Sequence, residues 1–162
     1  MDLRPLLPFF QWCDETTIGA YIRSKTWVFP VIETVHILAL TVLFGSVLLI
    51  DLRLMNAGMR KQPISLLSRT LRPYTETSIA IILVTGFMLF LSEALKCFGN
   101  VGFQFKMVFL SMALVFHYVL FRRLANSDKR LETYPMLAKF VAVVSMFLWF
   151  AVGVGGRAIG FV

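Results

Sequence analysis

Four long apolar runs constrain this chain more than any other feature. A transmembrane helix needs about 20 mostly apolar residues to cross a hydrocarbon core about 30 Å thick. Backbone groups find no water in that core, so a spanning segment must satisfy its own hydrogen bonds as a helix. We therefore expect an all-α integral membrane protein, a four-helix bundle with up-down-up-down topology. The expected spans cover about residues 27–50, 78–95, 103–121 and 137–161.

Composition supports this class and excludes two others. The 162 residues are 58% hydrophobic and 15% charged, whereas soluble domains are about 45–50% apolar and about 25% charged. Disordered chains combine low hydrophobicity with high net charge. The net charge of +7 comes from basic residues between the apolar runs, which indicates membrane topology and no nucleic-acid partner. The expected partners are the lipid bilayer and other membrane protein subunits or further copies of this chain.

The distribution of Lys and Arg predicts the orientation, because cytoplasmic loops hold these residues in excess. Ten of the 16 fall in the loops after the first and third spans, and the rest fall elsewhere. Both termini are therefore expected outside, on the periplasmic side of a multi-pass protein of the bacterial inner (cytoplasmic) membrane. Residues 1–26 are expected to form an interfacial amino-terminal segment without a cleavable signal peptide. Residues 27–162 are expected to form the bundle.

Ionisable residues inside the spans are the candidate functional residues. Each costs roughly 2.5 to 3.5 kcal/mol to insert and usually faces the bundle interior. In the first span, Glu33 and His36 are three residues apart and share a helix face with Asp51. Lys106 and His117 share a face of the third span, because eleven residues at 100° each return to within about 20° of the start. We expect Lys106 to be the buried end of that span.

The second and fourth spans carry weaker signals. Ser78, Thr85 and Ser92 recur at intervals of seven, with Gly86 beside Thr85, and small and hydroxyl residues at such spacing favour close helix packing in lipid. The fourth span ends in the sequence GVGGRAIGF. Its glycines permit close backbone approach, and its Arg157 offers a permanent cation near the outer surface.

The two histidines suggest a cofactor. They fall on spans that run in the same direction, and ligands that project inward from facing helices are how bundles commonly hold a metal or haem. His36 and His117 would then be the axial ligands and metal-binding residues of haem b. Glu33, Lys106 and Arg157 would complete the cofactor-binding set, with Glu33 orienting His36 and the two cations facing the propionates.

The depths of the two imidazoles test this hypothesis, and the sequence leaves the result open. Measured from the outer markers Trp27 and Lys106, the histidines lie about 13.5 and 16.5 Å down, which is a match. Measured from the inner ends of the same spans, they lie about 22 and 7.5 Å up, so these depths do not match.

Other interpretations stay open beside haem. Glu33 and His36 could handle protons or a metal ion, or the histidines could only pair with neighbouring helices. Cys13 and Cys97 both fall on the expected outer side, which is compatible with a disulfide, and neither has a metal-ligand spacing. No nucleophile elbow of the hydrolase type occurs in the chain.

Four segments of the chain carry a family pattern: IRSKTWVFPVIETVHILALTVLFGSVLLIDLRL, TGFMLF, GFQFKMVFLSMALVFHYVLF and LWFAVGVGGRAIGF. Over roughly residues 20–162 they resemble an uncharacterised family of four-span bacterial inner-membrane proteins. The resemblance implies the four-span fold and a set of functional positions, but no activity. These positions are Trp27, Glu33, His36, Asp51, Arg53, Lys106, His117 and Arg157. A looser similarity to copper-resistance D-type and small cytochrome b membrane proteins adds weight to a metal or a haem.

Three functions from different classes follow. The first is a membrane-embedded haem b electron-transfer protein or the membrane anchor subunit of a redox complex. The second is a non-redox accessory or assembly subunit of a larger membrane complex, and the third is a small copper- or ion-handling membrane protein. The sequence indicates no enzyme activity for the chain by itself and is compatible with a subunit of an oxidoreductase.

Overall fold

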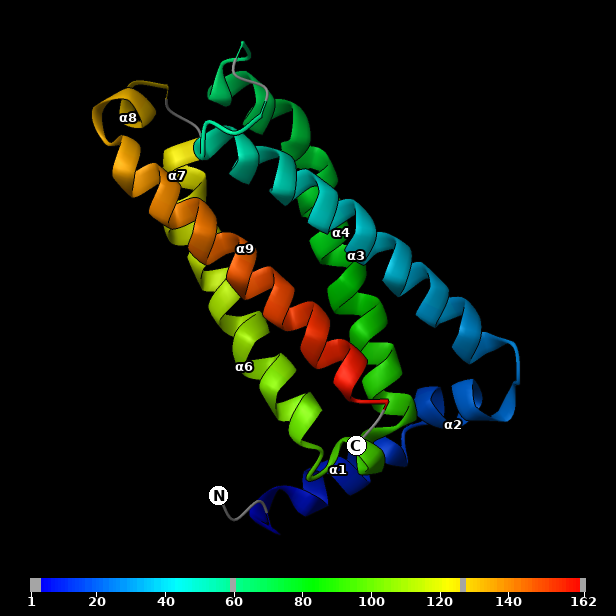
Figure 1. Cartoon of the computed structure of the whole chain (residues 1–162). Helices are drawn as coiled ribbons and strands as arrows, with labels where there is room; N and C mark the ends of the chain where they lie inside the picture. Colours follow the sequence, from blue (N-terminus) through cyan, green and yellow to red (C-terminus); the bar gives the residue numbers. More distant parts are fainter. Residues whose placement is uncertain (1–3, 59–60, 126–127, 161–162) are drawn as a thin grey trace.

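The computed structural model of the chain is built of helices (Figure 1) and describes residues 4–58, 61–125 and 128–160. Within these residues four helices are long and apolar enough to cross a membrane. They are α3 (Val28–Leu54), α4 (Ile64–Ser92), α6 (Val101–Phe116) with its π-helical continuation (His117–Phe121), and α9 (Pro135–Ala158). The expected all-α, four-span fold is therefore confirmed.

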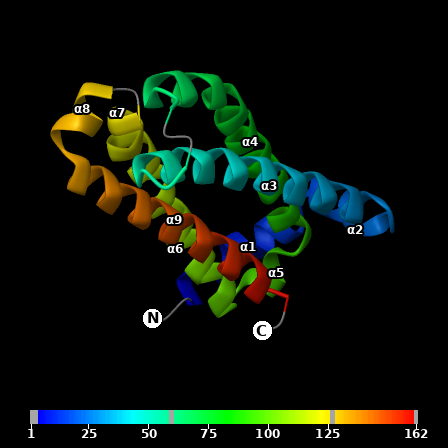
Figure 2. The ribbon, with the colours of Figure 1, turned by 45° about the horizontal axis from the view of Figure 1, so that its top comes forward.

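Shorter helices lie at the two ends of the bundle (Figures 1 and 2). One end, here called the α5 end, holds α1 (Leu7–Asp14), α2 (Thr17–Ser24), α5 (Ala94–Cys97) and the last turn of α9. The other, the α8 end, holds α7 (Arg122–Ala125) and α8 (Asp128–Thr133). A short 3₁₀ turn (Arg4–Leu6) precedes α1. Because the chain crosses the bundle four times, the amino-terminal helices and the end of α9 lie on the same side of it.

The four long helices do not pack uniformly. Helix α9 packs along α6 and against α3, and α3 packs along α4 (Figures 1 and 2). Close packing of α6 on α9 depends on Gly155, where a Cβ would lie 3.1 Å from the Lys106 Cα atom. Small residues at such a position let two backbones approach in lipid. Helices α4 and α6 are packed less closely, and a cavity lies between them.

The α5 end is fastened by polar contacts that the apolar runs do not reveal. The Thr16 side chain caps α2 by accepting a hydrogen bond from Gly19 N at 3.3 Å. Arg23 bonds to Asp14 Oδ1 at 3.2 Å and to the Ser92 carbonyl at 2.9 Å. The amino-terminal segment is therefore docked on the carboxyl end of α4 through side-chain and backbone bonds.

At the α8 end, Asp128 caps a helix that is remote from it in sequence. Its carboxylate accepts bonds from Ile64 N at 2.7 Å, from Ser65 N at 3.3 Å and from the Ser65 hydroxyl. These bonds hold the pKa of Asp128 below its ordinary value. The preceding residue, Pro63, makes no side-chain cap of its own, so α8 supplies the cap that α4 lacks.

The structure adds two details to the sequence analysis. Helix α4 begins at Ile64, fourteen residues before the start of the apolar span expected at about 78–95, so the helix is longer than that span. Cys13 and Cys97 are both free and buried, so the structure contains no disulfide between them. Burial raises the pKa of both thiols, and it raises that of Cys97 to about 11, with a contribution from Glu93.

Candidate functional site

His36 is held in one orientation and one tautomer by Thr85 of α4. The imidazole is 6% exposed, and its Nδ1 lies 2.8 Å from Thr85 Oγ1. The Thr85 hydroxyl donates its only hydrogen to the Ile81 carbonyl at 2.6 Å. The hydroxyl oxygen must therefore accept from His36 Nδ1–H, which leaves the lone pair on Nε2. That nitrogen is buried and has no hydrogen-bond partner among the described residues.

A cavity of about 440 Å³ lies between α4 and α6 and is here called the α4–α6 cavity. His36 and Lys106 are the two ionisable side chains that line it, and most of the remaining wall is aromatic or aliphatic. The wall consists of Phe9, Phe10, Leu40, Ile82, Leu83, Gly86, Phe87, Phe90, Phe103, Met107, Leu110, Trp149 and Val152. Such a cavity offers one nitrogen lone pair and one cation in apolar surroundings, which is typical of a small-molecule or cofactor site.

Gly86 makes room for the His36 ring. A Cβ at this position would lie 3.2 Å from His36 Cε1, closer than an ordinary van der Waals contact. In the sequence, Thr85 and Gly86 predict only helix packing, and the structure assigns both of them to the surroundings of one imidazole. The signal that could have identified them is a hydroxyl and a glycine side by side in a span opposite a histidine.

Glu33 and Arg157 do not join this group. The Glu33 side chain is exposed, and Thr85 occupies the position beside His36 Nδ1 where Glu33 was expected. The expectation that Glu33 orients His36 is therefore wrong. Three residues along a helix place two side chains within about 60° of each other, which is enough to separate a buried face from an exposed one. Arg157 is exposed in the last turn of α9.

His117 lies toward the other end of the bundle. It begins the π-helical continuation of α6, at a small cavity that it shares with Ile50, Glu76 and Arg122. Eleven residues separate it from Lys106, which corresponds to about 16 Å along the helix. Its buried Nδ1 has no hydrogen-bond partner in the described part of the chain.

The structure therefore does not bring the two histidines together. Ile50, the neighbour of His117, is fourteen residues after His36 on α3, or about 21 Å. A metal bound by two imidazoles needs both nitrogens within roughly 2 Å of it. One iron shared by His36 and His117 does not fit this geometry. Lys106 lines the same interior cavity as His36, so it does not mark an outer surface, and the match that is measured from the outer markers does not hold.

Among residues 4–58, 61–125 and 128–160 no group of three or more His, Cys, Asp or Glu side chains is arranged to hold a bare metal ion. His36 offers a single nitrogen, which suits a metal whose other ligands come from a bound organic group.

The fold and the cavities define the class: a multi-pass helical membrane protein with polar side chains turned into an apolar bundle. The chain belongs to a protein family of unknown function, DUF6644, whose model matches residues 9–162. No curated protein and no solved structure matches the chain.

Proposed function

We propose that the protein binds haem b in the α4–α6 cavity through His36 and serves as a membrane-embedded electron-transfer protein or anchor of a redox complex. The observation that carries this proposal is the His36 imidazole, which gives its Nδ1–H to Thr85 and keeps a buried, unpartnered lone pair on Nε2 within the described residues. Metal-ligating histidines have this arrangement, because a hydrogen bond at one nitrogen fixes the other as the ligand. A bound haem would supply one-electron redox chemistry.

The rest of the cavity supports the same ligand. Its volume of about 440 Å³ falls within the range of roughly 300–1,000 Å³ for small-molecule sites. Lys106 lines the wall, where its ammonium can pair with a carboxylate such as a propionate. The parallel rings of Phe90 and Phe103, with centroids 5.5 Å apart, belong to the wall and suit a flat apolar ligand.

The visible spectrum of protein purified from haem-replete cells tests the proposal. We expect a Soret band that is lost in His36→Ala and retained in His117→Ala, because the two imidazoles lie at different levels. Imidazole added to His36→Gly should restore the band, which separates lost ligation from lost folding. Colourless, folded wild-type protein would refute haem binding, and loss of the band in His117→Ala alone would refute its assignment to His36.

The mouth of the cavity favours a second candidate, a quinol taken from the membrane. Leu83, Phe87 and Met107 belong to the cavity wall and are exposed on the outside of the bundle, so a lipid-soluble ring can enter from the bilayer. The His36 lone pair would accept a quinol hydroxyl, and Lys106 would donate to the opposite oxygen. Saturable binding of a short-chain quinol by colourless protein, abolished in His36→Ala, would favour this candidate over haem.

We also propose that the protein is an inner-membrane protein of a bacterium with both termini outside. The excess of Lys and Arg in the loops after the first and third spans supports this orientation. A carboxy-terminal alkaline phosphatase fusion should be active, and the matching green fluorescent protein fusion should be dark. The opposite pair of results would reverse the orientation.

A further inference from the structure

Asp51 is a buried carboxylate that the proposed haem site does not use. It is fully buried in α3 toward the α8 end, and neither carboxylate oxygen has a hydrogen-bond partner in the described chain. Its polar neighbour is Ser145 of α9, whose hydroxyl interacts with the carboxyl group but forms no hydrogen bond of good geometry with it. The Ser145 hydroxyl carries no charge, so this contact does not neutralise a buried carboxylate.

Another group must neutralise the carboxylate, because an isolated charge in an apolar interior costs several kcal/mol. Two arginines near the α8 end already have other partners. Arg53 Nε donates to the Gln62 carbonyl at 2.7 Å, and Arg122 pairs with Glu76 at 3.2 Å. No basic side chain among the described residues bonds to Asp51, so its carboxylate must take a proton or a cation that these residues do not supply.

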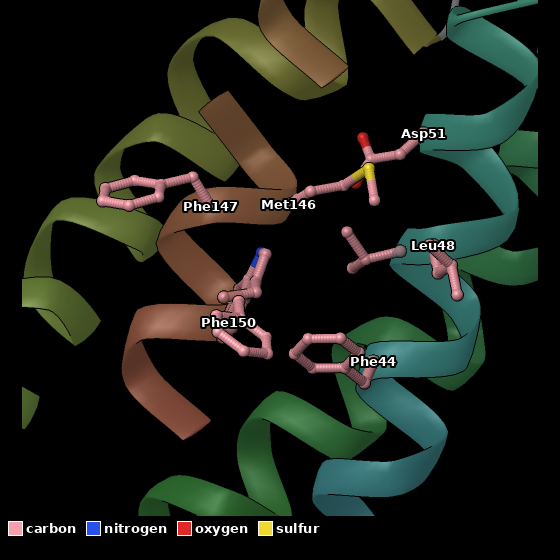
Figure 3. Close-up of a pocket in the computed structure, with 8 residues that line it drawn as sticks. Phe44, Leu48, Asp51, Met146, Phe147 and Phe150 are labelled. Atoms are coloured by element: carbon pink, nitrogen blue, oxygen red, sulfur yellow. The ribbon is translucent and has the colours of Figure 1, made fainter. Parts of the chain in front are cut away.

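A cavity of about 250 Å³ lies beside Asp51 (Figure 3). This α3–α9 cavity is lined mainly by aromatic and aliphatic side chains and by one thioether. Figure 3 shows Asp51 and Met146 reaching toward each other across it, with Phe44 and Phe150 near its other end. Phe147 and Phe150 are more than 60% exposed, so the cavity opens toward the bilayer.

We propose that the α3–α9 cavity binds a lipophilic organic cation, an amine or quaternary ammonium, whose charge pairs with Asp51. Aromatic rings attract cations through their negatively charged faces, and this attraction grows when water is excluded. The Asp51 carboxylate supplies the full negative charge, and the apolar rim admits the organic part of the ligand. The site does not include His36, although Trp149 borders both this cavity and the α4–α6 cavity.

The test uses purified full-length protein in detergent and benzyltrimethylammonium as the probe, followed by isothermal titration calorimetry. We expect saturable binding of the cation and none of neopentylbenzene, which has the same shape without the charge. Asp51→Asn should weaken binding at least about tenfold, because the charged partner is lost. Glu33→Gln should leave it unchanged, because that acid is exposed on the same helix and lies outside the cavity.

Two further variants keep the proposal falsifiable if Asp51→Asn fails to fold. Phe150→Leu removes an aromatic wall and should weaken cation binding by about threefold or more. Phe140→Leu, at an exposed ring on the same helix outside the cavity, should have no effect. Equal binding of the cation and its neutral analogue, or no binding of either, would overturn the proposal and leave a proton as the partner of Asp51.

Discussion

Replacing Thr85 by valine should separate the role of its hydroxyl from its role in packing. Valine has nearly the same shape but cannot accept the His36 Nδ1–H bond of 2.8 Å. The Ile81 carbonyl loses only an additional bond, because it keeps its bond within the helix ladder. A buried donor left without an acceptor costs about 1–3 kcal/mol. We expect Thr85→Val to lower the free energy of unfolding by that amount.

Thr75→Val is the matched control. Thr75 is also buried in α4, and its hydroxyl donates to the Leu71 carbonyl at 3.1 Å. Loss of this hydroxyl removes a bond within α4 and leaves no donor on another helix without an acceptor. We therefore expect the free energy of unfolding to fall by less than about 1 kcal/mol. Unfolding in mixed detergent micelles, followed by far-ultraviolet circular dichroism, measures both variants under the same conditions.

The same substitution tests the tautomer of His36. In Thr85→Val the ring can avoid an orphaned Nδ1–H only by moving its proton to Nε2, which removes the lone pair that the proposed haem needs. Haem affinity should fall by about 10- to 100-fold, as for other partners of ligating histidines. In a His36→Leu background, Thr85→Val should cost little, because both polar groups are gone. Equal losses of stability in Thr85→Val and Thr75→Val, or an undiminished loss in the His36→Leu background, would refute the reasoning.

Three further predictions concern packing, capping and thiol reactivity. Gly155→Ala should destabilise the bundle by about 1–3 kcal/mol, because the new Cβ would press on the α6 backbone. The control is Gly153→Ala, whose Cβ would have no neighbour within 4 Å. It should stabilise α9 by about 0.5–1 kcal/mol in the same unfolding assay. Asp128→Asn should cost about 1 kcal/mol at pH 7. Because folding lowers the pKa of Asp128, the stabilisation is present above its ordinary pKa of 3.8 and disappears as the pH falls through the folded value. The free energy of unfolding should therefore change less between pH 7 and pH 3 in the variant than in the wild type. The pKa of Cys97 rises from 9.0 to about 11, so in a Cys13→Ala background iodoacetamide at pH 8 should modify the folded protein about a hundredfold more slowly than the unfolded one; equal rates would contradict the burial of this thiol.

The four spans could be predicted from sequence because hydropathy adds up over a long window. No single residue decides whether about 20 apolar residues form a helix in lipid. The inward position of Lys106 could also be predicted, because an ionisable side chain in an apolar span usually faces the bundle interior. The start of α4 could not, because a polar extension of a helix has the same composition as a loop until its cap is known. That cap, Asp128, is 64 residues away from Ile64.

The candidate site was predicted only in part, and the reason is geometric. Spacing along one helix gives the direction of a side chain and its rise, so His36 and Lys106 could each be assigned to an inward face. The level at which two helices meet depends on their offset and crossing angle, which spacing within each helix does not contain. Matching His36 with His117 by distance from assumed surface markers therefore gave two incompatible answers. The structure also gives no polar partner to His117 Nδ1 among the described residues.

Two glycines contain the information that was missing. The two ionisable side chains of the α4–α6 cavity each lie against a glycine of a neighbouring helix: His36 against Gly86, and Lys106 against Gly155. A long polar side chain that turns into a packed bundle needs space, and a missing Cβ provides it without loss of the helix. Pairing each of these two residues with its glycine on the adjacent antiparallel span aligns α3 with α4 and α6 with α9. The cavity that the two pairs share then brings His36 and Lys106 together, and His117 lies about 16 Å further along α6.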